Sequence, residues 1–322
     1  MFKIDAILHP TDFSEESHHA FEYAYDLAEQ WGAELHLLHV APSLGDDPVR
    51  GAFDASLDEE EFYRTIRDEV DQKMQSLIDT VEQSDVPVHR IHSRGIAPAD
   101  VISEYAEHEG MDIVVMGTEG RRGVSRLLLG SVTAEVVRKA PCAVLTVQED
   151  ANIPSDVKRV LTPVDLSEFS RPLLRAAREV TATFNASMDV LTVVEPLPFP
   201  VPLVGAVTLH DLMPDPIEQS RKQLDRLVQT TEGLPVSIET HVKEGHAAMM
   251  IIDTAGELDS DLILMASHGR TGLERIMLGS VTARVVRQAT CPVCVLKVQP
   301  EEIEEPSEST SSGSDRKTSK AS

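Results

Sequence analysis

The residue types best suited to chemistry gather in one glycine-rich segment of the first half of the chain. It reads Gly117-Thr118-Glu119-Gly120-Arg121-Arg122-Gly123 and is followed by Gly130-Ser131-Val132-Thr133. Glycines let backbone N–H groups approach an anion closely, and Ser131 can begin a helix whose N-terminus favours negative charge. Arg121 and Arg122 add positive charge. This combination predicts a site for phosphate groups.

The segment occurs a second time. Asp112–Val147 aligns without gaps on Asp261–Leu296, with 18 identities in 36 positions, which indicates a duplicated domain. The second half supplies the matching candidates Ala266, Ser267, Gly269, Arg270, Gly272, Gly279, Ser280, Val281 and Thr282. A turn and a helix cap with surface arginines would also account for one such segment, but the recurrence in register favours a ligand site.

Two differences separate the halves. Glu119 is replaced by His268, and a carboxylate near phosphate oxygens is unfavourable unless a divalent ion or Arg121 intervenes. Ala266 stands in place of Gly117, and a Cβ there would be strained if the backbone had a positive φ. These differences leave three alternatives, in which one half, both halves or neither half binds a ligand.

Several familiar catalytic and metal patterns are missing or poorly placed. No Gly-Lys-Ser, Gly-Lys-Thr, Gly-x-Ser-x-Gly or His-Glu-x-x-His occurs in the chain. Cys291 and Cys294 form a C-x2-C pattern at the entry to a strand, where their side chains point to opposite faces. His89 and His92 are separated in the same way. We expect no catalytic residues, no redox pair and no metal site.

Each half reads as alternating strands and helices. Short apolar runs of the kind buried in parallel sheets predict strands, and apolar residues at helical spacing predict the helices between them. A helix capped by Asp12 or Ser14 is predicted after the first strand. The predicted strands of the first half are Ile4–Leu8, Leu35–Val40, Val86–His92, Ile113–Met116 and Ala143–Val147, and its later helices are Asp58–Val81, Pro98–His108 and Ser131–Lys139.

Parallel neighbours need crossover connections, so this order predicts an α/β fold of two tandem, doubly wound, Rossmann-like domains with a five-stranded parallel sheet each. We place the first domain at residues 1–148, a linker at 149–157, the second domain at 158–298 and a disordered tail at 299–322. The tail contains almost no apolar residues. The linker and its flanks reach about 36 Å when extended, enough for the domains to pack together.

Composition restricts the partners. The 322 residues carry 54 acidic and 29 basic side chains, a net charge of −25, which disfavours nucleic acid. We also expect no membrane segment and no signal peptide, and the three cysteines suit a reducing cytoplasm. The acidic, arginine-rich composition favours a halophilic protein of a salt-rich cytosol, with an ordinary acidic protein as the alternative.

The pattern Gly-x2-Gly-x9-Gly-Ser, with Pro10-Thr11-Asp12 after the first strand and Pro-Cys before the last, resembles the universal stress protein family. The resemblance covers both halves. It implies an adenine-nucleotide-binding fold with strand order 3-2-1-4-5, in which the loops after strands one and four flank the point where ligands bind. It also implies that the last strands of the two halves pair within the chain as a pseudo-dimer.

The resemblance also assigns roles to residues. Pro10, Asp12 and Val40 would line an adenosine pocket, and Asp12 would accept hydrogen bonds from adenosine. Backbone N–H groups around Gly117 and Gly130 and the Ser131 hydroxyl would bind the phosphates. The full candidate set adds Thr118, Gly120, Arg121, Gly123, Val132 and Thr133 in the first half and Pro163, Asp165 and Val194 in the second. Helix capping is the alternative role for Asp12 and Asp165, and the two roles are compatible.

These observations favour a cytoplasmic stress-response protein that binds ATP, alone or with Mg²⁺ or Mn²⁺, and acts in regulation rather than catalysis. A slow, divalent-ion-dependent nucleotide hydrolase or phosphotransferase is one alternative. An interaction module with empty sites is the other. The full chain is expected to be a compact monomer or a homodimer of such pseudo-dimers.

Overall fold

A computed structural model describes residues 3–42, 59–81, 85–118, 129–148, 151, 157–195, 215–267 and 278–300, with residues 59–62 described by their backbone alone. The predicted linker lies outside these residues except for Ala151 and Val157, and so does the predicted tail beyond Pro300.

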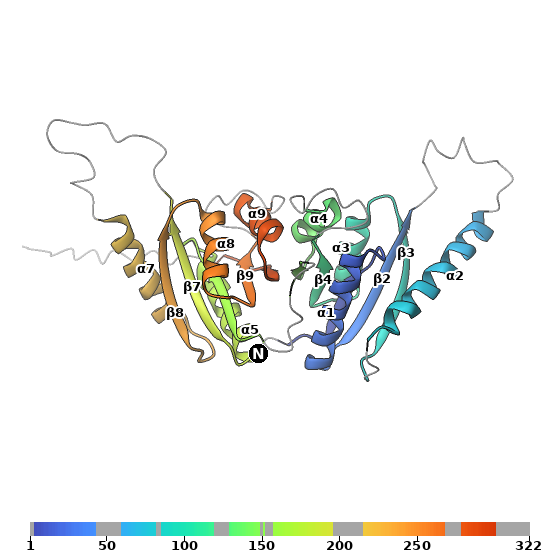
Figure 1. The fold of residues 1–322 in the computed structure, drawn as a ribbon, viewed down its shortest axis with the longest axis horizontal. Helices are drawn as coiled ribbons and strands as arrows, with labels where there is room; N and C mark the ends of the chain where they lie inside the picture. Colours follow the sequence, from blue (N-terminus) through green and yellow to red (C-terminus); the bar gives the residue numbers. More distant parts are fainter. Residues whose placement is uncertain are drawn as a thin grey trace, which may run out of the picture.

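The first half alternates strands and helices as predicted (Figure 1). Helix α1 begins after its N-cap Ser14, whose hydroxyl accepts a hydrogen bond from Ser17 N, and ends at Gly32, which adopts a left-handed conformation with φ of 65°. The elements are β1 (Ala6–Pro10), α1 (Glu15–Trp31), β2 (Glu34–Pro42), α2 (Glu59–Ile78), β3 (Val88–Gly95), α3 (Pro98–His108), β4 (Ile113–Gly117), α4 (Ser131–Lys139) and β5 (Ala143–Val147).

The second half repeats this order. Its helix α5 begins after Phe169 without a side-chain cap, two positions later in the repeat than α1. The elements are β6 (Arg159–Pro163), α5 (Ser170–Thr183), β7 (Ser187–Val194), α7 (Pro216–Thr230), β8 (Ile238–Glu244), α8 (Ala247–Glu257), β9 (Leu262–Ala266), α9 (Ser280–Gln288) and β10 (Val293–Leu296).

The strands of the two halves form one sheet. Their order is β3-β2-β1-β4-β5-β10-β9-β6-β7-β8, so the described strands of each half follow the predicted order 3-2-1-4-5 and run parallel. The halves join where β10 pairs antiparallel with β5, with Val293 opposite Thr146 and Val295 opposite Val144. The predicted pairing of the last strands within one chain is therefore present.

Each face of this sheet carries one apolar core that continues through both halves. Helices α1, α2, α5 and α7 cover one face, where Phe21, Leu27, Met74, Leu174 and Leu224 are buried. Helices α3, α4, α8 and α9 cover the other, where Ile102, Val136, Ile251 and Val285 are buried. This arrangement is the doubly wound architecture that the sequence predicts. In Figure 1, α2 and α7 lie at opposite ends of the molecule and α4 and α9 lie near its centre.

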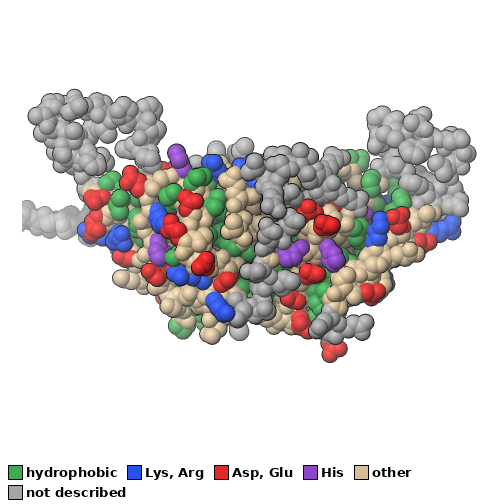
Figure 2. All heavy atoms as spheres, in the orientation of Figure 1, with side chains coloured by type: hydrophobic (Ala, Val, Ile, Leu, Met, Phe, Trp, Pro, Cys, Tyr) green, Lys and Arg blue, Asp and Glu red, His purple; other side chains and the backbone are tan. Residues whose placement is uncertain are grey.

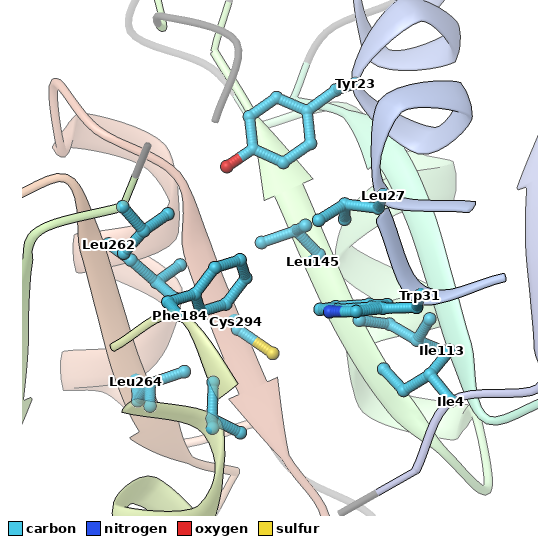
Figure 3. A pocket seen from close by; sticks show the side chains of 12 residues that line it. Ile4, Tyr23, Leu27, Trp31, Ile113, Leu145, Phe184, Leu262, Leu264 and Cys294 are labelled. Atoms are coloured by element: carbon cyan, nitrogen blue, oxygen red, sulfur yellow. The ribbon is translucent and has the colours of Figure 1, made fainter. Parts of the chain in front are cut away.

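Side chains from both halves meet beside the central strands. The rings of Trp31 and Phe184 pack with their centroids 5.8 Å apart. They line a small apolar pocket with Tyr23, Leu145 and Cys294 (Figure 3). On the other face, Lys297 donates hydrogen bonds to Val137 O and Arg138 O at the end of α4, and Gln148 donates to Val286 O in α9. Gln148 and Lys297 occupy matching positions after the last strand of each half, and each thus contacts the last helix of the other half.

The predicted bounds of α3, α4 and β5 agree with the structure, but the first strand is displaced by two residues. It was expected at Ile4–Leu8 and is Ala6–Pro10. The side chain of Asp112 accepts hydrogen bonds from Asp5 N and Ala6 N at 2.7 and 3.0 Å. Asp112 directly precedes β4, so its side chain fixes the start of β1 beside that strand. Asp261 bonds Lys158 N and Arg159 N in the same way.

None of the described helices has the length and apolar character needed to cross a bilayer. On the face drawn in Figure 2, the acidic and basic side chains of the described residues are interspersed over the helices.

The β5–β10 ladder generates a prediction for the isolated first half. Every residue of β5 is buried in the full chain, and an open apolar edge strand invites pairing with another chain. Residues 1–150 are therefore expected to dimerise, whereas the full chain satisfies this edge internally. Light scattering on both proteins at low and at molar salt tests this, because salt screens the repulsion between acidic copies. A half-length protein that stays monomeric at both salt concentrations contradicts the edge-pairing account.

Candidate functional site

The two loops that could form a site meet where β1 and β4 lie side by side. Ile7 and Leu8 pair with Ile113 and Val114. His9 is fully buried, and its Nδ1 lies 2.9 Å from Val115 O, which joins the ends of the two strands. The first turn of α1 then passes directly over Gly117, since a Cβ on that residue would lie 3.0 Å from Glu16 O. The chain after β1 and the end of β4 thus form one continuous surface.

Asp12 and Asp165 form the same tight turn in both halves. Asp12 Oδ1 accepts hydrogen bonds from Ser14 N at 3.0 Å and Ser14 Oγ at 2.7 Å. Asp165 Oδ1 accepts them from Ser167 N and Oγ at 3.0 and 2.6 Å. The residue inside each turn, Phe13 or Leu166, has a positive φ of about 60°, which bulky side chains rarely adopt.

Strained backbone conformations cluster at functional sites. The recurrence of this strained turn in both halves therefore favours a functional role for it. Neither aspartate caps a helix directly, because the N-cap of α1 is Ser14 and that of α5 is Phe169. The capping role considered for Asp12 and Asp165 is therefore replaced by one in which each aspartate holds the turn after the first strand.

The segments after β4 and β9 are closed by matched hydrogen bonds. Gly130 N donates to Thr118 O at 2.9 Å, and Gly279 N donates to Ser267 O at 3.4 Å. Thr133 Oγ1 donates to Gly117 O, and Thr282 Oγ1 donates to Ala266 O. These bonds hold the N-termini of α4 and α9 against the ends of the strands that precede them. Ser131 and Ser280, the first residues of these helices, are exposed.

The glycines that precede α4 and α9 are not explained by backbone strain. Gly130 and Gly279 are the N-caps, with φ of −55° and −57°, values open to any residue. A Cβ on Gly279 would meet Thr282 Oγ1 and Ser267 O at ordinary contact distances of 3.6 and 3.7 Å. No described side chain caps either helix, so the first-turn N–H groups keep their capacity to bind an anion.

The remaining described candidates line the same strand ends. Pro10 and Pro163 are the last residues of β1 and β6, and Val40 and Val194 lie near the carboxyl ends of β2 and β7. The expected match of Val194 with Val40 is wrong by one residue, because Leu38 lies opposite Pro10 and Leu191 lies opposite Pro163. Val193 therefore occupies the position of Val40, and Val194 faces the other side of the sheet. Val132 and Val281 are half-buried in the first turns of α4 and α9. The structure thus gathers every described candidate at the carboxyl end of the parallel strands. Gly120, Arg121, Gly123, Gly269, Arg270 and Gly272 lie outside the described residues, as do Glu119 and His268.

A polar pocket adjoins this edge in the first half, between α2 and the ends of β2 and β3. His39, Arg67, His92 and Arg94 are among its lining residues. The guanidinium of Arg94 lies 3.6 Å from the centroid of the Tyr63 ring. The neighbouring Gly95 has no room for a side chain, since a Cβ would lie 2.4 Å from Val101 Cγ2.

The backbone conformation of Ala266 does not produce the strain that a positive φ would cause. Neither Gly117 nor Ala266 has a positive φ. The first half needs glycine for a different reason, namely the close approach of Glu16 O to Gly117. In the second half, helix α5 begins two positions later in the repeat, at Ser170. Ala266 stands there at the position that matches Gly117.

The cysteines have the properties of core residues. Cys291 and Cys294 are buried in the cores on opposite faces of the sheet, as the strand pattern predicts. Burial raises the pKa of both thiols to about 12 and that of Cys142 to about 11. A thiolate is the reactive form, so these pKa values disfavour redox or nucleophilic chemistry at neutral pH.

His9 is a site residue that the sequence analysis missed. Burial lowers its pKa to about 4, its Nδ1 contacts Val115 O, and its Nε2 lies 3.5 Å from Ser17 Oγ. Ser17 Oγ donates in turn to Thr11 Oγ1 at 2.9 Å. The second half has Thr162 at this position, so comparison of the repeats gave no signal for the histidine.

Comparison with known proteins agrees with this architecture. The model of the universal stress protein family matches residues 3–148 and 156–297, which together make up most of the chain. The chain belongs to this family. A universal stress protein of Methanocaldococcus jannaschii is 35% identical over 142 residues, which cover 44% of this chain and 82% of that protein.

Longer relatives match both halves of this tandem universal stress protein. A universal stress protein E homolog of Haemophilus influenzae is 25% identical over 210 residues, covering 62% of this chain and 66% of that protein. The crystal structure of a universal stress protein from Archaeoglobus fulgidus has a TM-score of 0.61 at 22% identity and covers 92% of this chain and 97% of that chain. The latter similarity shows that the fold is shared.

The buried His9 predicts a pH dependence of stability. Its pKa is about 4 in the folded protein and 6.5 in an unfolded chain, so between these values the unfolded state binds more protons. The free energy of unfolding should therefore fall as the pH decreases from 6.5 to 4, by about 3 kcal/mol in total from this group.

Urea denaturation across this pH range, on the natural protein and on His9→Thr, measures the effect. Threonine is the residue of the second half, so this variant keeps a hydroxyl-bearing residue that the fold already accepts at the matching place. The difference in slope between the two proteins isolates His9 from the other histidines. Equal slopes contradict a neutral His9 in the folded state.

Proposed function

We propose that this universal stress protein binds adenine nucleotide, with ATP as the ligand, at the carboxyl edge of each half, and that binding serves regulation in a stress response rather than turnover. The observation that carries the proposal is the pair of helix N-termini behind Gly130 and Gly279, which no side chain of the described residues caps. Both are fixed against the end of the preceding strand, and both present an exposed serine in the first turn.

Phosphate fits this arrangement for electrostatic reasons. The first N–H groups of a helix lack intrahelical partners and lie at the positive end of the helix dipole, so they favour an anion. Glycine at the N-cap adds no side chain between those groups and a ligand, although Ser, Thr, Asp or Asn would cap the helix better. The exposed hydroxyls of Ser131 and Ser280 would add one further donor each.

The adenosine end would lie toward β1 and β2. Asp12 and Asp165 are held by matching turns beside the strand ends. Val40, and Val193 at the same position of the second half, would provide apolar surface beside them. Ligands of open α/β sheets bind in the crevice outside these carboxyl ends, where the strand order reverses. The resemblance of the Pro-x-Asp and Gly-x2-Gly-x9-Gly-Ser patterns to the family supports adenine as the base.

The described groups around the site offer weak support for catalysis. His9 lies at the junction of β1 and β4, and its burial, its contact with Val115 O and its pKa of about 4 make it a poor general base. We therefore propose that the bound nucleotide persists as a ligand. A divalent ion such as Mg²⁺ or Mn²⁺ could accompany the phosphates.

The experiment is a set of matched glycine variants in the full chain. Gly130→Val and Gly279→Val place a side chain over the N-terminus of α4 or α9, and each should weaken ATP binding to its own half by at least tenfold, measured by calorimetric titration. The double variant should lose saturable binding. The fold should tolerate both changes, because the two glycines have negative φ and a Cβ on Gly279 meets only ordinary contacts.

Gly256→Ala is the matched control, since its Cβ enters open space on α8, away from both helix N-termini. It should bind ATP as the natural protein does. Affinities within twofold of the natural protein in both valine variants mean that the phosphate site is misplaced.

A further inference from the structure

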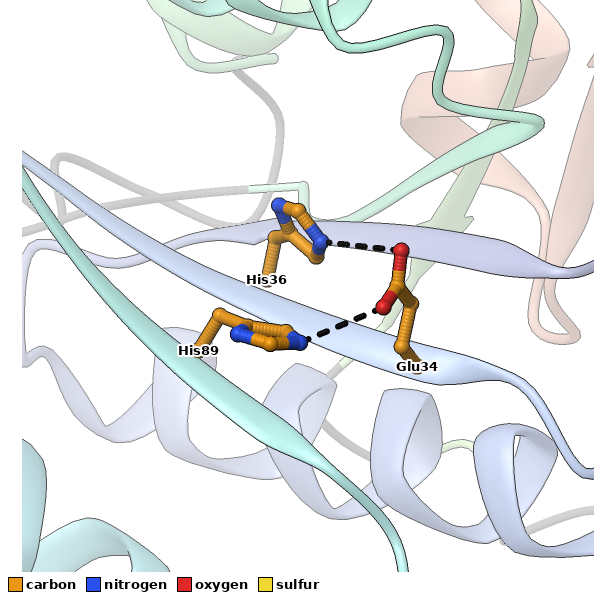
Figure 4. Close-up of side chains that lie close together, drawn as sticks. All are labelled: Glu34, His36 and His89. Atoms are coloured by element: carbon orange, nitrogen blue, oxygen red, sulfur yellow. Dashed lines mark hydrogen bonds and ion pairs between the residues drawn. The ribbon is translucent and has the colours of Figure 1, made fainter.

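A cluster of potential metal ligands lies in the first half at the opposite end of the strands from the nucleotide site. Glu34 and His36 lie at the start of β2, and His89 lies beside His36 on the edge strand β3 (Figure 4). His36 Nε2 is 3.4 Å from Glu34 Oε1, and His89 Nε2 is 3.2 Å from Glu34 Oε2. The side chains of Glu34 and His89 are about half exposed, at 45% and 48%, so an ion could enter from solvent.

His36 is the buried member of the cluster. The residue is 8% exposed, and its Nε2 is buried without a hydrogen-bond partner, because its 3.4 Å contact with Glu34 lacks the geometry of a hydrogen bond. Its other nitrogen, Nδ1, lies 2.7 Å from the hydroxyl of Tyr105 in α3. When Nδ1 carries the ring proton and donates it to Tyr105, Nε2 directs a lone pair toward Glu34 and His89. Metal-bound histidines commonly have this second hydrogen bond.

The spacing fits a tetrahedral ion. Two ligand atoms that each lie about 2.0 to 2.1 Å from Zn²⁺ at a tetrahedral angle are about 3.3 Å apart. The two contacts of Glu34, at 3.2 and 3.4 Å, bracket that value, although a different carboxylate oxygen makes each of them. One ligand atom from each of the three residues lies within 4.8 Å of the others, so the side chains would draw closer together to bind the ion. Two imidazoles and a carboxylate are a ligand set that Zn²⁺ uses with water in the fourth position.

The second half shows what a cation does at the same place. Sheet register equates His36 with Asp189, because they lie opposite the matching residues Leu8 and Leu161. It also equates His89 with Glu239, which lie opposite His36 and Asp189 on the next strand of each half. There the guanidinium of Arg159 bonds both oxygens of Asp189, at 2.6 and 3.1 Å, and lies 4.0 Å from Glu239. The residue that matches Arg159 in register is Ala6, which supplies no charge.

We propose that Glu34, His36 and His89 bind Zn²⁺, so that the first half takes up an inorganic cation where the second half has its own arginine. The ion would bond Nε2 of both histidines and one carboxylate oxygen of Glu34, with water completing the tetrahedron. It would join the edge strand β3 to β2 near their first residues. It would also stabilise the folded state, with a free energy that grows with the logarithm of the ion concentration above the dissociation constant.

The test uses the full chain, freed of metal with a chelator and of nucleotide by dialysis. Calorimetric titration with zinc chloride should show one tight site per chain. Zinc should also raise the midpoint of thermal unfolding, and Co²⁺ should give the visible absorption of a tetrahedral complex. His89→Ala should weaken the tight site by at least tenfold and abolish the Co²⁺ spectrum. This variant should fold, because His89 is about half exposed on an edge strand.

His108→Ala is the matched control, since it removes an exposed histidine of the same half that is also paired with a glutamate. It should retain the tight site and the spectrum. Glu34→Gln, which keeps the size of the side chain, should weaken zinc binding as His89→Ala does. Equal zinc affinity and stoichiometry in the natural protein, His89→Ala and Glu34→Gln would overturn the proposal, as would weak binding that all variants share.

Discussion

The antiparallel ladder between β5 and β10 is the interaction on which the rest of the structure depends. Each half ends in a short strand whose residues are all buried, and alone it would leave that strand as an open apolar edge. Pairing Val144 with Val295 and Thr146 with Val293 removes both edges at once and makes one ten-stranded sheet. The two cores continue across this junction, so a duplicated sequence becomes one packed unit.

The same junction positions the helices whose N-termini form the candidate sites. The C-terminal end of α4 is held by Lys297 of the second half, and α9 is contacted by Gln148 of the first. A cation near the C-terminal end of a helix interacts favourably with the helix dipole. Burial lowers the pKa of Lys297 to about 8. Each candidate site therefore belongs to one half, while the helix that carries it is fixed by contacts with the other.

Local signals predicted most of the fold, and contacts between distant segments account for what was missed. Helix α4 was predicted with its correct bounds, because Ser131 follows Gly130 and can begin a helix. Strand β1 was displaced because the side chain of Asp112, far along the chain, bonds the backbone of Asp5 and Ala6. The cluster of Glu34, His36 and His89 depends on the register of two strands, which the separate positions of its histidines do not reveal.

The central claim is that the carboxyl edge of each half holds an adenine nucleotide. Native mass spectrometry of the full chain mixed with ATP and Mg²⁺ tests it most directly, because it counts bound ligands on the intact protein. The account predicts a saturable series of masses for the chain with one and then two nucleotides. A spectrum that contains only the unliganded chain at millimolar ATP would contradict it.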